Sequence, residues 1–519
     1  MQRPRRWRAC AAVLAIGVAT GLAHTAELDD AMRAGQRMFQ TGHGRDGAPV
    51  GATLAAGAVR LSGAAVACAR CHGTRGDGTH EAGLATPPLA EAALTRPRRD
   101  GAGLPGRPAY DPSLLRRALR HGVDAGGRLL NPAMPRFSLA PQEEEDLFAY
   151  LRVLGSDADL APGVSGDAVE VALVGDGSPA SRAARDAALA CLKDLNDRGG
   201  VFGRRVTWRL WDAASTADAS AWRRLADRSA LVLAPWWPDA EAFDDFARFA
   251  AAERLAVIGP VAPAARDVAP SSTVFHVAPD AGDALRVLVD HLAPRRAGHA
   301  VPVAVIVSPD GRDGEDVALM RRQWALHVEA AFEEVEDDAP AALAARLARL
   351  RPAAVVVLGD LGSVERADEA LALAGLPDRT PLHALYARTG SGVTRLGLRA
   401  RQRLELLHAH PLGAEADPRR MLALLRQQGV VPAHPAAQSL GYAAGCLAAE
   451  GLVRAGRRLT REGLVRGLET VTRFETGVTM PLTFGPRQRR GVWGARLVRV
   501  EGNGLAAVTS WRAPLDASR

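Results

Sequence analysis

One five-residue segment, Cys68-Ala69-Arg70-Cys71-His72, constrains the fold of this chain more than any other feature. The pattern C-x-x-C-H is the attachment signature of c-type haem. Two intervening residues set the sulfur atoms at the spacing of the porphyrin vinyl groups, and the histidine that follows is then held beneath the iron. The segment therefore predicts one covalently bound haem c, attached through Cys68 and Cys71, with His72 as an axial iron ligand.

Two other interpretations of this segment fit the rest of the sequence poorly. A thioredoxin-like dithiol lies at a strand-to-helix junction of a βαβ unit, and no such pattern surrounds Cys68. A structural zinc site needs four ligands, and the sequence contains no second C-x-x-C pair.

The second axial ligand is predicted to be Met134, in Asn131-Pro132-Ala133-Met134-Pro135. A thioether on an extended, proline-flanked loop can be held against the open face of the iron. Histidine and methionine together raise the haem potential and close the iron to substrates. Met32 and Met38, on a helical pattern before the motif, are poorer candidates, and His121 is a further alternative.

Two helical patterns flank these ligands. Residues 31–41 place Gly35 and Phe39 on one face, and residues 141–154 carry apolar residues at the helical period, including Tyr150 and Leu151. With C-A-R-C-H and M-P-R-F, residues 27–155 resemble a class I cytochrome c domain, an all-α fold. The resemblance implies crossed terminal helices and the transfer of single electrons between redox partners, a dehydrogenase donor and a cytochrome or oxidase acceptor.

Residues 1–26 have the pattern of a cleavable signal peptide: a basic start, an apolar run over 9–22, then small residues. The apolar run is shorter than the ~20 residues that a membrane-spanning helix needs. We therefore expect a periplasmic protein without a transmembrane segment in its mature chain. Cleavage after Ala23 or Ala26 fits the pattern. Four arginines of this segment contribute to the net charge of +7, so the charge gives little indication of a nucleic-acid partner.

A different architecture is predicted after a small, polar segment over 156–167, which has the composition of an interdomain linker. Short apolar runs, such as 168–175 and 230–235, alternate with helical patterns such as 180–196 and 240–252. This alternation predicts an α/β fold with a parallel sheet and crossover helices.

The start of this second region carries a further resemblance. A first strand is followed by a helix ending in N-x-x-G-G-x-x-G, formed here by Asn196, Gly199, Gly200 and Gly203. Residues 168–512 thereby resemble a type I periplasmic solute-binding protein of the branched-chain amino-acid-binding type, from the substrate-binding proteins of ABC transporters. The resemblance implies two lobes, near 168–277 with 412–480 and near 280–406 with 490–512, that close on a solute.

Loops at the carboxyl ends of parallel strands line the cleft of such a fold. The candidate cleft residues are Asp176, Ser178, Ser181, Trp236, Trp237, Asp239, Asp310, Arg312, Tyr386 and Arg388. Each has a structural alternative, since Asp176 and Ser178 can cap a helix, the tryptophans can pack and the arginines can be solvated. Amino-acid binders of this family typically have Ser or Thr where this chain has Trp236-Trp237, which puts an amino-acid ligand in doubt.

Cys191 and Cys446 fall on apolar faces of helical patterns. We predict that they are buried free thiols, with a disulfide as the alternative.

Taken together, these features predict a periplasmic electron carrier with a fused binding domain that docks a partner or senses a ligand. A quinoprotein dehydrogenase is one such partner, by analogy alone. The alternative is an ABC-type receptor whose haem reports redox state. An enzyme of the haem peroxidase kind needs an open iron position, which a bound Met134 would fill, so we do not expect an enzyme.

Overall fold

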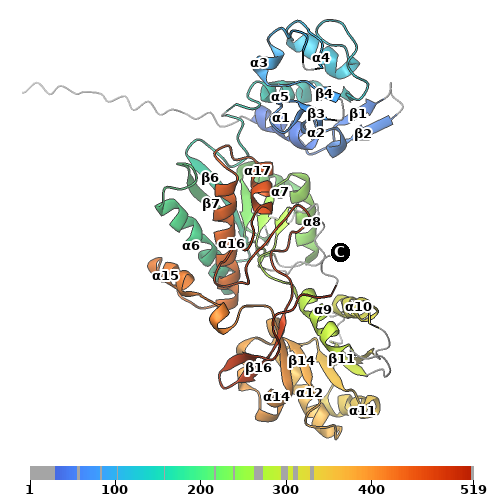
Figure 1. The fold of residues 1–519 in the computed structure, drawn as a ribbon, viewed down its shortest axis with the longest axis vertical. Coiled ribbons are helices and arrows are strands. Elements are labelled where there is room, and N and C mark those ends of the chain that lie inside the picture. Colours follow the sequence, from blue (N-terminus) through green and yellow to red (C-terminus); the bar gives the residue numbers. More distant parts are fainter. Residues whose placement is uncertain are drawn as a thin grey trace, which may run out of the picture.

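The computed structural model describes residues 30–515 apart from 55–58, 82–83, 102, 157, 215–217, 238–239, 262–272, 294–301, 308–313 and 328–331 (Figure 1). The predicted signal peptide and the cleft candidates Asp239, Asp310 and Arg312 lie outside the described residues. Within the described ranges, no helix has both the length and the apolar character needed to cross a membrane.

The described residues of the N-terminal domain form five α-helices. These are α1 (Asp30–Thr41), α2 (Ala69–His72), α3 (Glu91–Leu94), α4 (Pro112–His121) and α5 (Pro141–Leu151). Short strands supplement the predicted helices. The antiparallel sheet comprises β1 (Gly51–Leu54), β2 (Val59–Ser62) and β5 (Arg136–Ser138), and a separate hairpin comprises β3 (Thr79–Glu81) and β4 (Leu84–Thr86). The domain is therefore mainly helical, with small sheets that a purely all-α description omits.

Helices α1 and α5 pack together, as the resemblance described above implied. A side chain on Gly35 would lie 2.0 Å from the carbonyl oxygen of Asp146, so only glycine permits this close contact. The rings of Phe39 and Tyr150 meet edge to face at 5.6 Å. Helix α5 begins at Pro141, and the Glu143 carboxylate accepts a hydrogen bond from the amide of Ala140 (2.8 Å).

The first lobe of the second region contains a parallel five-stranded sheet in the order β10-β9-β8-β6-β7. Its strands are β6 (Ala168–Gly175), β7 (Arg205–Asp212), β8 (Leu231–Leu233), β9 (Ala256–Ile258) and β10 (Val274–Phe275). Its helices are α6 (Pro179–Asp197), α7 (Ala219–Arg228), α8 (Ala240–Ala252), α15 (Arg419–Gln427), α16 (Pro435–Arg454) and α17 (Arg461–Glu469). The central strands are buried on both faces, as expected for a parallel sheet covered by helices.

The second lobe repeats this strand order and extends it. Its sheet has the order β12-β11-β13-β14-β15-β16-β17, in which β16 and β17 are antiparallel. The strands are β11 (Val303–Val307), β12 (Phe332–Glu336), β13 (Ala354–Val357), β14 (Leu382–Leu385), β15 (Leu404–His408), β16 (Arg496–Glu501) and β17 (Gly504–Ala507). The helices are α9 (Ala281–Leu292), α10 (Gly314–Trp324), α11 (Pro340–Leu350), α12 (Leu361–Leu373), α13 (Tyr386–Thr389) and α14 (Leu398–Arg403).

The chain passes between the two lobes three times: after β10, after β15 and before β16. Two of these crossings lie side by side. The amide of His276 donates to the carbonyl of Arg489, and the amide of Gly491 donates to the carbonyl of His276, both at 2.9 Å. The lobes are therefore joined by paired extended segments (Figure 1).

The prediction of free thiols at Cys191 and Cys446 is wrong, because the two residues form a disulfide with their Cα atoms 5.1 Å apart. The reason is the close packing of α6 on α16. A side chain on Gly441 or Gly445 would lie 2.0 Å from a backbone carbonyl oxygen of α6. The two helix backbones thus approach closely enough for the cysteines to be bridged.

The predicted linker, 156–167, is not a solvated tether. Ala161 and Val164 are buried in the core of the first lobe. The carboxylate of Asp159 accepts hydrogen bonds from the Tyr150 hydroxyl (2.8 Å) and the Gly155 amide (2.9 Å). Burial raises the pKa of Asp159. Small and polar composition indicated a break between domains, but tertiary contacts hold the segment in place.

Candidate functional site

The motif residues lie on one short helix at the wall of a large cavity. Helix α2 follows Cys68, and the amide of His72 donates to the carbonyl of Cys68 (2.9 Å). Cys68 and Cys71 are three residues apart in this turn, so their side chains lie on the same side of it. Both are free cysteines, and Cys71 is exposed.

The cavity has a volume of about 700 Å³ and mainly apolar walls. Cys68, Cys71, His72 and Met134 all line it. Other wall residues come from α1, α3, α4, α5 and the segments between them, and include Phe39, Leu94, Leu115, Ala118, Phe137, Leu147 and Leu151. A flat, largely apolar group such as a porphyrin fits such walls, and two thiols, an imidazole and a thioether supply the attachment and ligand chemistry of haem c.

His72 is held in one orientation. The side chain is 5% exposed, and its Nδ1 lies 2.8 Å from the carbonyl oxygen of Pro87. Since a carbonyl can only accept, Nδ1 carries the hydrogen and Nε2 keeps its lone pair. Burial lowers the pKa of His72, although the hydrogen bond to Pro87 opposes this. The imidazole is therefore neutral near pH 7, the form that can bind a metal ion.

Met134 lies in a tight turn between α4 and β5. Its amide donates to the carbonyl of Asn131 (2.9 Å), and the Asn131 side chain accepts from the amide of Ala133 (2.9 Å). The Arg136 guanidinium donates to the Met134 carbonyl. The structure thus brings Met134 to the same cavity as His72.

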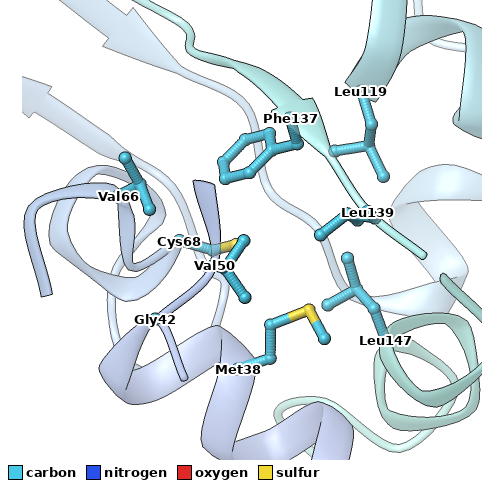
Figure 2. A pocket seen from close by; sticks show the side chains of 9 residues that line it. All are labelled: Met38, Gly42, Val50, Val66, Cys68, Leu119, Phe137, Leu139 and Leu147. Atoms are coloured by element: carbon cyan, nitrogen blue, oxygen red, sulfur yellow. The ribbon is translucent and has the colours of Figure 1, made fainter. Parts of the chain in front are cut away.

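Figure 2 shows the apolar residues beside Cys68, among them Val50, Val66 and Phe137. In these surroundings, burial raises the pKa of the Cys68 thiol to about 12. The alternative ligand Met38 is 3% exposed and lines only a small void next to this cavity, while His121 is exposed and does not line the cavity. Both therefore fit an iron ligand less well than Met134.

Sequence reasoning missed Arg107, a buried cation in the cavity wall. The side chain is 6% exposed, and its guanidinium donates to the carbonyls of Ala93 (2.6 Å) and Pro108 (2.8 Å). It stacks 4.4 Å from the centre of the Tyr110 ring. Burial lowers the pKa of Arg107, and its hydrogen bonds in the described part of the chain are to backbone carbonyls. No sequence pattern distinguishes it from the other arginines of this arginine-rich chain.

In the first lobe, three cleft candidates meet after β6. The amide of Ser178 donates to Asp176 Oδ1 (2.9 Å), and the Ser178 hydroxyl oxygen accepts from the amide of Ser181 (3.2 Å) as the N-cap of α6. Burial acts against the charged form of Asp176, but hydrogen bonds from Ser178 and Ser181 hold its pKa below the ordinary value. Asp176 and Ser181 line a cavity of about 400 Å³ with Arg182, Arg185, Trp211 and Asp212.

The prediction of Trp237 as a cleft residue is wrong. Its ring is 2% exposed and stacks on Phe246 with the ring centres 4.6 Å apart, inside the core between the sheet and α8. Trp236 is half-buried, and its amide donates to the carbonyl of Val174 (3.0 Å). The loop after β8 thus folds back on β6, which turns one aromatic ring into the core.

In the second lobe, Tyr386 and Arg388 lie on α13, directly after β14. The centre of the Tyr386 ring lies 5.0 Å from the centre of the His408 ring. The Arg388 guanidinium forms an ion pair with Asp316 of α10 and donates to the carbonyl of Leu358. The structure therefore gives both residues partners within their own lobe.

Comparisons with known proteins agree with this division of the chain. The family model "Periplasmic binding protein" matches residues 168–505, and the model "Cytochrome c" matches residues 51–155. The search of curated proteins found no match.

Solved structures resemble the second region. A fatty acid ABC transporter substrate-binding protein from Thermomonospora curvata is 14% identical, with a TM-score of 0.50, over 68% of this chain and 95% of that chain. A branched chain amino acid ABC transporter from Thermus thermophilus with bound valine is 18% identical, with a TM-score of 0.52, over 67% of this chain and 97% of that chain. At these identities the likeness shows the fold alone.

The cytochrome c family implies a covalently bound haem c, and the cavity beside α2 has the residues for it. The match to the periplasmic binding protein model covers more than half of the chain and coincides with the two lobes. The chain belongs to the periplasmic binding protein family, and it carries a cytochrome c domain ahead of that fold.

Proposed function

We propose that this protein is a periplasmic carrier of single electrons that holds one haem c. Cys68 and Cys71 would form the thioether links, and His72 and Met134 would be the axial iron ligands. The observation that carries the proposal is that these four side chains line one cavity of about 700 Å³ with mainly apolar walls. Haem c supplies one-electron exchange between ferric and ferrous iron.

The residues of this chain set the conditions for that exchange. Pro87 orients the imidazole of His72 so that Nε2 is available, and the turn at Asn131 fixes the backbone of Met134. The buried guanidinium of Arg107 supplies a positive charge that would pair with a carboxylate of the porphyrin. The Met134 thioether would bind the iron and keep substrate from it, which supports a carrier and not an enzyme of the peroxidase kind.

The proposal includes the predicted organisation: a signal peptide over 1–26, a cytochrome domain over 27–155, a connecting segment over 156–167 and a binding domain over 168–512. The binding domain would dock a redox partner or take a small-molecule ligand. The electron donor would be a periplasmic dehydrogenase, such as a quinoprotein, and the acceptor a cytochrome or an oxidase.

A second candidate function is a transport-type receptor whose haem reports redox state. The cavity of about 400 Å³ beside Asp176 favours it, because polar groups remain there at the end of a central strand. A solute that raises the melting temperature of the protein without changing its haem potential would support the receptor.

The experiment that tests the leading proposal is absorption spectroscopy of the purified protein mixed with reduced candidate dehydrogenases. We expect ferric haem to become ferrous within seconds, with one electron taken up per chain. A colourless protein, or a pigment that no periplasmic dehydrogenase reduces, would contradict the electron-carrier function.

A further inference from the structure

Helix α1 has a second face that contacts the first lobe of the binding domain. Gly35 and Phe39 pack on α5, whereas the neighbouring Arg37 extends toward α7. Arg37 is 8% exposed; its guanidinium forms an ion pair with Asp227, and its Nε lies 3.6 Å from Glu253 Oε2. A cation on the cytochrome domain is therefore buried against two carboxylates of the lobe.

Glu253 is shared with a second buried arginine. Arg461, at the start of α17, places Nη1 3.7 Å from Glu253 Oε2 and donates from the same nitrogen to the Glu253 carbonyl (3.0 Å). Arg461 is 9% exposed and Glu253 is 8% exposed. We call Arg37, Asp227, Glu253 and Arg461 the interdomain ion cluster. It pairs two positive with two negative charges: Arg37, Glu253 and Arg461 are buried, and Asp227 is partly exposed.

A second contact involves the loop after α1. The Arg223 guanidinium of α7 donates to the carbonyl of Asp46. Gly47 has φ +74°, and a side chain there would lie 1.8 Å from Arg223 Nη2. The positive φ favours glycine at this turn, but the approaching atoms belong to the flexible end of Arg223, so the contact itself does not require glycine.

The connecting segment forms the third contact. Gln36 of α1 donates from Nε2 to the Leu160 carbonyl (2.9 Å) and to Asp159 Oδ1 (3.1 Å). One turn of helix therefore contacts both the lobe, through Arg37, and the segment that enters it, through Gln36. The amide of Ala161 in turn donates to the carbonyl of Leu459, just before α17 (3.3 Å).

We propose that the surface formed by α7, the end of α8 and the start of α17 is a docking surface for the cytochrome c domain. The domain and the first lobe then form one rigid body, and only the second lobe moves when the cleft closes. This goes beyond the proposed function, since it holds whatever the cleft binds. Because Phe39 of α1 also lines the haem cavity, one helix separates the lobe from the cofactor site.

The test is the rate at which thermolysin cleaves the connecting segment of the full-length protein. Gln36 of the docked domain holds the carbonyl of Leu160, so undocking should expose the peptide bond before Leu160, whereas Ala161 and Val164 stay buried in the core of the first lobe. We expect Arg37→Asp and Asp227→Arg each to speed cleavage by on the order of 10- to 100-fold, as an opened buried ion pair should. The double variant Arg37→Asp/Asp227→Arg restores the pair and should return the rate to within about threefold of the wild type.

Arg60→Asp is the matched control, because Arg60 is exposed on β2 and the charge change is the same; its cleavage rate should equal that of the wild type. Small-angle scattering should show one compact particle for the wild type and a larger maximum dimension for each single variant. Asp227 is 40% exposed in its side chain, so its variant keeps the test open if Arg37→Asp fails to fold.

Rapid cleavage of the wild type, or single variants that are cleaved no faster than the control, would overturn the proposal. A failed electron-carrier function would instead appear as a pigment that no dehydrogenase reduces, in a protein whose cleavage rates still follow the charge variants. The failure of the docking surface and the failure of the electron-carrier function are therefore distinguishable.

Discussion

The cavity of the cytochrome domain and the cleft side of the binding domain differ in what their functional candidates contact. In the cavity, Cys68, Cys71, His72 and Met134 line one space, and the two cysteines are free. In the binding domain, Ser178 caps a helix, Arg388 pairs with Asp316, and Trp237 lies in the core.

This difference separates residues that could bind a cofactor from residues that stabilise the fold. Thiols and an imidazole beside an apolar cavity have no equivalent role in packing, so their gathering indicates a cofactor. Polar residues at strand ends have such roles, because they cap helices and form ion pairs. Among the predicted cleft residues, Asp176 and Ser181 line the cavity of about 400 Å³ at the end of β6.

The largest effect is expected from Cys68→Ser/Cys71→Ser. Without either thiol no thioether can form, so we expect complete loss of covalently bound pigment. Acid–acetone extraction followed by absorption spectroscopy measures this. The thermal unfolding of the binding domain should be unchanged, and a pigment that still resists extraction would contradict the attachment site.

Met134→Ala should lower the haem potential by on the order of 0.1–0.3 V, a part of the range of about 0.8 V that axial ligands control. The reason is that a thioether stabilises ferrous iron. Redox titration gives the shift, and the methionine–iron absorption band of the oxidised protein should disappear. Met38→Ala is the matched control. An unchanged potential in Met134→Ala would favour an open iron position and hence a peroxidase-like enzyme.

Cys191→Ser/Cys446→Ser tests the binding domain alone. The disulfide closes a very long loop, so its loss should lower the free energy of unfolding by about 2–5 kcal/mol. Urea unfolding followed by tryptophan fluorescence measures the change, and the haem spectrum should stay the same. Equal stability of the variant and the wild type would mean that the two thiols are free.

The smallest effect is expected from Ser178→Ala. Loss of the N-cap of α6 should lower the free energy of unfolding by about 1 kcal/mol. Calorimetry with and without candidate solutes separates this role from ligand binding. Were the variant as stable as the wild type but unable to bind a solute, Ser178 would be a ligand residue after all.

The sequence predicted both folds and the residues gathered at the cavity because the relevant signals are local. C-x-x-C-H lies within one helical turn, and the loop at Met134 is shaped by the prolines on either side. The N-x-x-G-G pattern at the end of α6 likewise acts at one turn: the Asn196 side chain accepts from the amide of Val206 (2.7 Å) and donates to its carbonyl (2.8 Å). Such short-range constraints can be read without knowing what packs against them.

Other features depended on elements that lie far apart in the sequence. Cys191 and Cys446 meet because glycines of α16 let its backbone approach α6, and Trp237 is buried because α8 covers it. Arg37 and Arg107 look like any other arginine until the fold buries them. The sequence by itself determined the cofactor chemistry and the two folds. Only the tertiary structure decided the disulfide, the burial and partners of the predicted cleft residues, and the contact between domains. The physical reason is that burial and ion pairing depend on which distant surfaces meet, and that choice belongs to the packing of the whole chain.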